Sequence, residues 1–182
     1  MSICNPVATL SERDSARRAA ILEAAKNCFL RFGYGKTSLD DIANEAGLSR
    51  PLLYRKYANK EAIFSAVYDA VFLAKFDEAA PIATGSGSAE HKLLAMCETV
   101  WVEPYAMILK APRPAEFWAA CEQVIPEIIA DHHRRWRALV GKVLAKELVE
   151  VFDLALDGLW ADEPSVAVFR RRMTVLIKRF TA

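Results

Sequence analysis

Apolar residues recur at steps of three and four along most of the chain, which is the spacing of one face of an α-helix. The first such stretch begins near Asp14, continues through Ile21, Cys28 and Phe29, and ends at Gly33. The alternation of apolar and polar positions that is typical of strands is nowhere convincing. The pattern therefore predicts an all-α protein.

Two short helices around a glycine turn are predicted after this first helix. Ser38 precedes an apolar and acidic run, residues 39–43, and can cap the free amides of a helix start. Gly47 suits a tight turn, Ser49 can cap the next helix, and Pro51 suits an early helical position. This is the layout of a helix-turn-helix, although two short helices around a glycine occur in many folds.

The remaining two thirds of the chain also follow helical spacing. Asn59 is the expected cap of a long fourth helix, and residues 81–88, the only Gly/Ser-rich stretch, predict a loop between two functional parts. Further on, Pro104 and Pro126 are expected to break the helical pattern. The last two helices are predicted at about residues 143–160 and 164–181.

The charge is unevenly distributed, although the net charge of the 182 residues is only +1. Residues 1–60 hold ten Lys and Arg against six Asp and Glu, whereas residues 61–182 hold fourteen against seventeen. A basic front third favours contact with a polyanion, or it is simply a solvated face. A hydrophobic content of 53% is enough for a sizeable core.

The cysteines and the apolar runs indicate a reducing cytosol and no membrane partner. Cys4, Cys28, Cys97 and Cys121 are scattered without a CxxC pair, so neither a disulfide framework nor a zinc site is expected. Charges interrupt every apolar block before it reaches the roughly 18 residues of a membrane helix. We therefore expect a cytoplasmic protein.

The sequence shows no pattern typical of an enzyme, a metal site or a cofactor site. His132 and His133 are adjacent, and neighbouring residues on a helix point about 100° apart, so they and His91 form no ligand cluster. No nucleophile and base, paired carboxylates or glycine-rich phosphate loop can be recognised. We expect no catalysis, no metal and no cofactor.

The helix-turn-helix segment resembles a known family at many positions. Residues 32–43, FGYGKTSLDDIA, and 46–61, AGLSRPLLYRKYANKE, are similar to the DNA-binding domain of the TetR family. The strong resemblance covers about residues 14–70. It implies a three-helix DNA-binding domain over residues 1–60, ordered from about residue 12, and a helical bundle over residues 61–182 for effector binding and dimerisation.

The resemblance also implies which residues contact a double-stranded, palindromic DNA operator. The expected contacts to the DNA backbone are Thr37, Ser38, Ser49, Tyr54, Tyr57 and Lys60. The expected contacts to base edges are Arg50, Pro51, Leu52 and Arg55. Tyr57 is equally compatible with a core position in the three-helix unit.

The segment of residues 90–125 is rich in aromatic and sulfur side chains, which suit an apolar ligand. The candidate pocket residues are Met96, Cys97, Trp101, Tyr105, Phe117, Trp118 and Cys121. Each of them is equally compatible with an ordinary core. Together they favour a hydrophobic or aromatic small-molecule effector.

Two hypotheses about function follow. The first is a ligand-responsive transcriptional regulator, more often a repressor than an activator, that binds DNA as a twofold homodimer through the last two helices. Two copies of the second short helix, held about 34 Å apart, would match consecutive major grooves. The alternative is a helical protein that binds a small molecule or a partner without DNA-binding activity.

Overall fold

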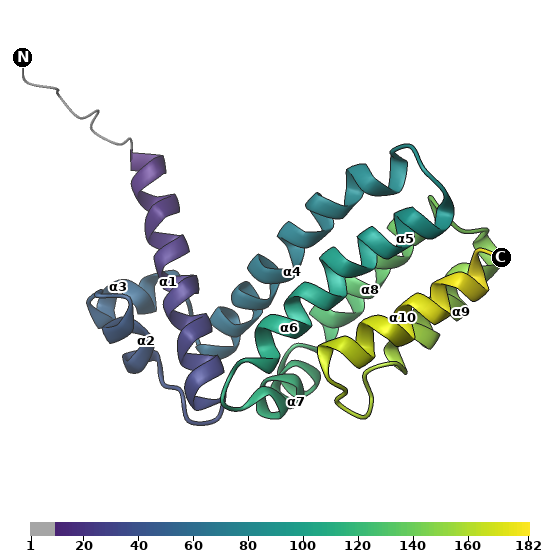
Figure 1. Ribbon diagram of the computed structural model, residues 1–182. Helices are drawn as coiled ribbons and strands as arrows, with labels where there is room; N and C mark the ends of the chain where they lie inside the picture. Colours follow the sequence, from purple (N-terminus) through teal and green to yellow (C-terminus); the bar gives the residue numbers. More distant parts are fainter. Residues whose placement is uncertain (1–9) are drawn as a thin grey trace, which may run out of the picture.

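A computed structural model describes residues 10–182, and the regular structure in that range is entirely helical (Figure 1). Residues 1–9, which include Cys4, lie outside the described residues. The prediction of an all-α protein is confirmed. The helices are α1 (Leu10–Phe32), α2 (Leu39–Glu45), α3 (Arg50–Lys56), α4 (Lys60–Thr84), α5 (Ala89–Cys97), η1 (Glu98–Val102), α6 (Glu103–Leu109), α7 (Pro114–Val124), α8 (Pro126–Val140), α9 (Lys146–Asp157) and α10 (Val166–Phe180).

Helices α1, α2 and α3 lie together at one end of the molecule and share a core with the beginning of α4 (Figure 1). Phe29 of α1, Ile42 of α2, Leu53 of α3 and Phe64 of α4 are all fully buried in it. The rings of Phe29 and Phe64 meet edge to face at 5.0 Å. Packing therefore continues from the expected DNA-binding part into the long helix that follows residue 60.

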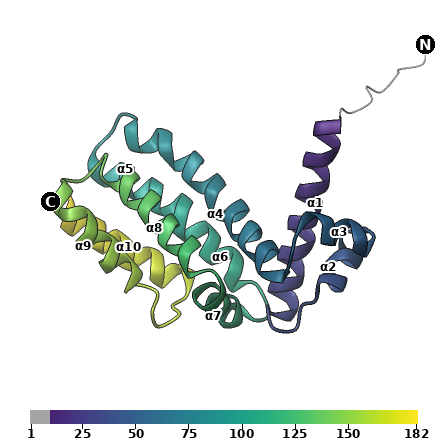
Figure 2. The same ribbon diagram turned by 180° about the vertical axis from the view of Figure 1, so that it is seen from behind.

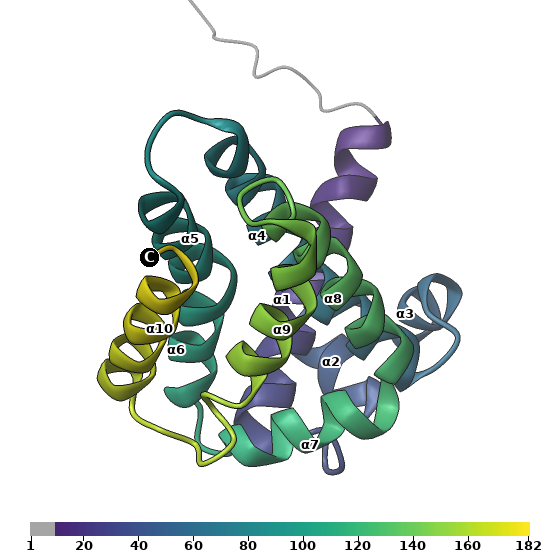
Figure 3. The ribbon, with the colours of Figure 1, turned by 90° about the vertical axis from the view of Figure 1, so that its right-hand side faces the viewer.

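Helices α4 to α10 form the larger part, with a second core between them. Figure 2 shows α4 beside α8, and Figure 3 shows α5 and α6 on one side with α8 and α9 on the other. Trp136 of α8, Phe152 of α9 and Phe169 of α10 are buried in this core. Helix α7 lies where the two parts meet and contacts α1, α6 and α8.

Helix α4 is longer than the sequence predicts. The expected loop at residues 81–88 begins only at Gly85, because α4 continues through Pro81 to Thr84. Proline disturbs a helix by lacking an N–H and by crowding the preceding turn. Pro81 lies in the last turn of α4, while Ala79 and Ala83 on either side of it are buried, so the packing of this end offsets the lost hydrogen bond.

Pro104 does not break the helical path either. Residues 89–109 run continuously through α5, η1 and α6, and the five residues of η1 form a π-helical turn. Pro104 then occupies the first turn of α6 and has no N–H to donate to the preceding turn. The wider turn changes the hydrogen-bond register ahead of the proline, which is how the helix accommodates it.

Candidate DNA-binding and ligand-binding sites

The turn into α2 is held by a reciprocal cap. The Asp41 N–H donates to Ser38 Oγ at 3.1 Å, and the Ser38 N–H donates to Asp41 Oδ2 at 2.8 Å. Hydrogen bonds from Ser38 also hold the pKa of the Asp41 carboxyl below its ordinary value. Gly47 then takes the left-handed conformation, with a φ of 64°, in the turn to α3. The sequence features of this segment thus produce the predicted helix-turn-helix.

Helix α3 presents a polar and cationic surface. Leu53 is fully buried and anchors the helix, whereas Arg50, Pro51, Tyr54 and Arg55 are exposed. Tyr54 is 52% exposed, which is high for a large aromatic side chain that has no partner to contact. The Arg50 guanidinium lies 2.9 Å from the Asp40 carboxylate of α2. Leu52 is half-buried at the edge of this surface.

Thr37 and Lys60 have structural partners that the sequence did not predict. Thr37 is buried, and its hydroxyl donates to the carbonyl oxygens of Gly33 at 2.8 Å and Cys28 at 3.2 Å. Lys60 Nζ donates to the carbonyl oxygens of Tyr34 at 2.8 Å and Thr37 at 3.0 Å. It also lies 4.3 Å from the centre of the Tyr34 ring. In this conformation both side chains hold the α1–α2 connection in place. We call the three-helix unit of α1, α2 and α3 the reader.

The other expected phosphate ligands differ in exposure and in the hydrogen bonds that their side chains already make. Ser38 is exposed, but its hydroxyl belongs to the α2 cap. Ser49 is at the N-cap position of α3 and makes no capping hydrogen bond through its side chain, contrary to the expected cap. Tyr57 is half-buried against the first core, so its ring takes part in packing. Of these three residues, Ser49 is exposed and its hydroxyl is not used in a helix cap.

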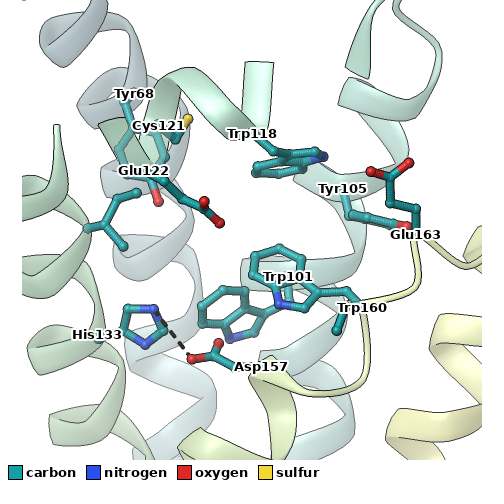
Figure 4. Close-up of a pocket in the computed structure, with 12 residues that line it drawn as sticks. Tyr68, Trp101, Tyr105, Trp118, Cys121, Glu122, His133, Asp157, Trp160 and Glu163 are labelled. Carbon is teal, nitrogen blue, oxygen red and sulfur yellow. Dashed lines mark ion pairs between the residues drawn. The ribbon is translucent and has the colours of Figure 1, made fainter. Parts of the chain in front are cut away.

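A cavity of about 490 Å³ opens in the second part of the molecule (Figure 4). Its five aromatic lining residues are Tyr68, Trp101, Tyr105, Trp118 and Trp160. The Trp160 ring lies 5.5 Å from that of Trp101 and 5.3 Å from that of Trp118, measured between centroids. The Tyr105 hydroxyl donates to the Pro164 carbonyl oxygen at 2.7 Å, which fixes its ring beside these tryptophans.

Three carboxylate residues and a histidine also line the cavity, namely Glu122, Asp157, Glu163 and His133. His133 Nε2 lies 3.9 Å from Asp157 Oδ2, and His133 Nδ1 lies 3.2 Å from Asp153 Oδ1. Burial raises the pKa of the Asp157 carboxyl, and Asp157 Oδ1 is a buried oxygen without a hydrogen-bond partner. The cavity therefore combines an aromatic wall with carboxylates.

The structure brings together four of the seven candidate pocket residues, which are Trp101, Tyr105, Trp118 and Cys121. The other three do not line this cavity. Met96 and Cys97 are buried in the second core, and Phe117 packs in the first core with its ring 5.5 Å from that of Phe64. Their side chains fill space between helices, which is the ordinary core role that the sequence left open.

We expect the His133 contact to make stability depend on pH. The hydrogen bond to Asp153 raises the pKa of His133 above its ordinary value, with Asp157 acting in the same direction and burial and Arg137 in the opposite one. The stabilisation by protonated His133 is then complete below about pH 6.5, the unfolded pKa, and is lost as the pH rises through the folded pKa. The stability difference between the wild type and His133→Gln, from urea unfolding, should therefore shrink as the pH rises above about 6.5. A constant difference would contradict the raised pKa.

Comparison with known proteins identifies the N-terminal part. The family model described as "Bacterial regulatory proteins, tetR family" matches residues 21–67, which run from α1 through the helix-turn-helix into α4. Over this segment, the chain is similar to the tetR family.

The relatives by sequence are named as transcriptional regulators. The transcriptional repressor ComR of Escherichia coli is 34% identical over 86 residues, which are 47% of this chain and 35% of ComR. The regulator RutR of the same organism is 43% identical over 53 residues, 29% of this chain and 25% of RutR. The chain thus matches about a third or less of the length of these relatives.

Solved structures of tetR-type proteins share the fold over nearly the whole chain. The structure described as the SmeT–triclosan complex has a TM-score of 0.68 and 19% identity, and the alignment covers 91% of this chain and 90% of SmeT. A TetR-like regulator from Rhodococcus has a TM-score of 0.66 and 24% identity, and the alignment covers 91% of this chain and 95% of that one. The helical bundle behind the reader is therefore that of the tetR fold.

Several cavity residues were not predicted from the sequence. Glu122 follows the predicted Cys121 directly, and the aromatic character of Trp160 was a visible signal. His133, Asp157 and Glu163 come from parts of the chain without a recognisable motif. Only the packing of α8, α9 and the turn before α10 brings them beside the aromatic wall.

The described residues offer little for other kinds of site. Cys28, Cys97 and Cys121 are buried free thiols, and burial raises the pKa of each. Within residues 10–182, the His, Cys, Asp and Glu side chains form no group of three or more that could hold a metal ion. Among residues 10–182, the helices lack an apolar stretch of the length that a membrane-spanning segment requires.

Proposed function

We propose that this protein is a ligand-responsive DNA-binding transcriptional regulator, acting as a repressor that a small molecule releases from its operator. The observation that carries the proposal is the exposed surface of α3 in a capped and well-packed helix-turn-helix. Arginine can grip guanine through two hydrogen bonds, and an apolar side chain can meet a thymine methyl group. Arg50, Pro51, Leu52 and Arg55 would read base edges, while Ser38, Ser49, Tyr54 and Tyr57 would contact phosphates.

We further propose the division into a DNA-binding domain over residues 1–60 and an effector-binding and dimerisation domain over residues 61–182, in a cytoplasmic protein. The structure does not support Thr37 as a phosphate ligand through its side chain, because its hydroxyl is buried and already bonded. Lys60 is reassigned to holding the reader together, since two carbonyl oxygens occupy its ammonium group.

Helix α7 offers a route by which an occupied cavity would reach the reader. Phe117 packs in the first core, and the adjacent Trp118 lines the cavity. At the same junction, a Cβ atom on Gly33 would lie 2.1 Å from Glu116 Oε2, so α7 rests closely on the end of α1. A ligand that moves Trp118 would therefore change the position of α1 relative to the larger part of the molecule. It would shift the equilibrium between two positions of the reader only as far as it binds one of them more tightly.

The regulator would act as a homodimer through α9 and α10. Val151 and Leu154 of α9 and Val175 of α10 are between 56% and 64% exposed, although they are large apolar side chains. Such residues on a pair of neighbouring helices are typical of an interface. A twofold dimer would place two copies of α3 on consecutive major grooves.

We expect Leu154→Glu combined with Val175→Lys to convert the dimer to a monomer and to weaken operator binding by at least about tenfold, because one reader contacts only half a site. Sedimentation velocity measures the first effect and a DNA titration the second. Leu73→Glu, at an apolar position of α4 that is 37% exposed, is the matched control. An unchanged sedimentation coefficient for the double variant would exclude this interface.

The function itself is tested by titrating labelled DNA from upstream of the protein's own gene at several salt concentrations, with random DNA as the control. Each neutralised phosphate contributes about −0.9 to the slope of log affinity against log salt concentration. A preference of about a thousandfold or more over random DNA would support the regulator. Weak binding without preference, even at low salt, would favour the alternative of a helical ligand- or partner-binding protein.

A further inference from the structure

We propose that the cavity recognises an organic cation with a flat aromatic body, and that Asp157 and Glu122 supply the charge recognition. This inference rests on the proposed function, because it names the chemical class of the effector. Recognition by aromatic residues alone would accept any apolar molecule that fits. The carboxylates around the cavity restrict the accepted ligands to molecules that also carry a positive charge.

The charges of the lining residues are unbalanced. Glu122, Asp157 and Glu163 line the cavity together with one histidine, and no Lys or Arg is among the lining residues. Figure 4 shows the carboxylates of Glu122 and Asp157 directed into the space beside the Trp101 and Trp160 rings. An anion placed there would meet several carboxylates without a permanent cation to balance them.

His133 can balance at most one of these charges, and it is shared between Asp157 and a carboxylate outside the cavity. Its Nδ1 is engaged with Asp153, a buried carboxylate outside the cavity lining, and its Nε2 is 3.9 Å from Asp157, which is longer than a hydrogen bond. Asp157 Oδ1 has no hydrogen-bond partner, and burial raises the pKa of this carboxyl. A positive charge near Asp157 would relieve a carboxylate that is poorly solvated and incompletely paired.

The aromatic wall favours the same kind of ligand. Trp101, Trp118 and Trp160 are in mutual contact through the Trp160 ring, and Tyr105 is stacked near Trp118 with 6.2 Å between centroids. The faces of such rings attract cations, and tryptophan attracts them most strongly. A flat cation would also gain from stacking between the rings.

A bare metal ion does not fit this arrangement. The acids come from separate parts of the fold, α7, α9 and the turn before α10, and within the described residues no cluster of three metal ligands forms. A cavity of about 490 Å³ is also far larger than an ion requires. Its size and its separated charges suit an organic molecule whose positive charge is spread over a ring system.

Three probes of nearly equal shape and different charge distinguish the effect of charge on affinity from the effect of shape. They are 1-methyl-4-phenylpyridinium, which is a cation, its neutral isostere 4-methylbiphenyl, and the anion biphenyl-4-carboxylate. Three of the four tryptophans line the cavity, so intrinsic fluorescence reports binding to the full-length protein. We expect the cation to bind at least about tenfold more tightly than the neutral probe, and the anion to bind most weakly.

Two double variants test the residues. Asp157→Asn with Glu122→Gln should reduce the affinity for the cation by about tenfold to a hundredfold and leave the neutral probe almost unaffected. Asp77→Asn with Glu127→Gln changes the charge equally at exposed positions outside the lining and should leave all three affinities unchanged. Circular dichroism confirms that the variants fold, and the neutral probe reports an intact cavity.

The inference is overturned if the neutral probe or the anion binds as tightly as the cation, if none of the three binds, or if the cavity variant keeps the preference of the wild type. The operator titration is independent of this result. Loss of the cation preference with operator binding retained would reject only the ligand class, whereas cation preference without operator binding would reject only the regulator.

Discussion

A variant with Arg50→Glu and Arg55→Glu should bind its operator at least about a thousandfold more weakly than the wild type. Each arginine that reads a base or a phosphate contributes about 1–3 kcal/mol, and the new carboxylates add repulsion from the DNA. The slope of log affinity against log salt concentration should also fall by about 1 for each phosphate that the variant no longer neutralises. Fluorescence anisotropy with labelled operator DNA measures both effects.

This variant should remain folded. Both arginines are exposed, and the one ion pair that the substitutions remove, Arg50 with Asp40, is a surface pair of small energetic value. A glutamate at position 50 lies in the first turn of α3, where a negative charge is favourable. The unfolding free energy should therefore change by less than about 1 kcal/mol.

The matched control is Lys142→Glu with Lys146→Glu, which changes the net charge equally at exposed positions around the α8–α9 connection. It separates the removal of specific interactions from a general change of charge. If the α3 variant and this control bound the operator equally well, α3 would not be the reading helix.

Lys60→Met should lower the unfolding free energy by about 1.5–3 kcal/mol, the range for hydrogen bonds to a charged group. The ammonium group donates to the carbonyl oxygens of Tyr34 and Thr37 and lies over the Tyr34 ring, and methionine replaces none of these interactions. Methionine retains the unbranched stem, so the packing of the side chain changes little. Urea unfolding followed by circular dichroism measures the change.

The same variant distinguishes the structural role of Lys60 from the phosphate contact that the family resemblance implies. Lys36→Met, at an exposed position of the same connection, is the control and should change stability little. A Lys60→Met protein with wild-type stability and weakened DNA binding would restore Lys60 as a phosphate ligand. A destabilised protein that still binds DNA below its unfolding midpoint would establish the structural role.

Local features of the sequence were sufficient to predict the helices and the reader. The spacing of Ile21, Cys28 and Phe29, the cap at Ser38 and the glycine at 47 act within one or two helical turns, and all of them produce the expected elements. The predicted start of the loop at Pro81 and the predicted helix break at Pro104 were wrong for a related reason. A proline preference is local, and packing of the surrounding helix or a π-helical turn can override it.

The cavity and the partners of single side chains depended on the tertiary structure. Asp157 and Glu122 lie 35 positions apart in the sequence and belong to α9 and α7, so no motif could place them around the same space. Lys60 meets Tyr34 across 26 positions for the same reason. The sequence by itself determined the helical fold and the helix-turn-helix, because periodicity and capping are short-range. Which carboxylates face the aromatic wall, and which lysine binds the backbone, was decided only by the packing of distant helices.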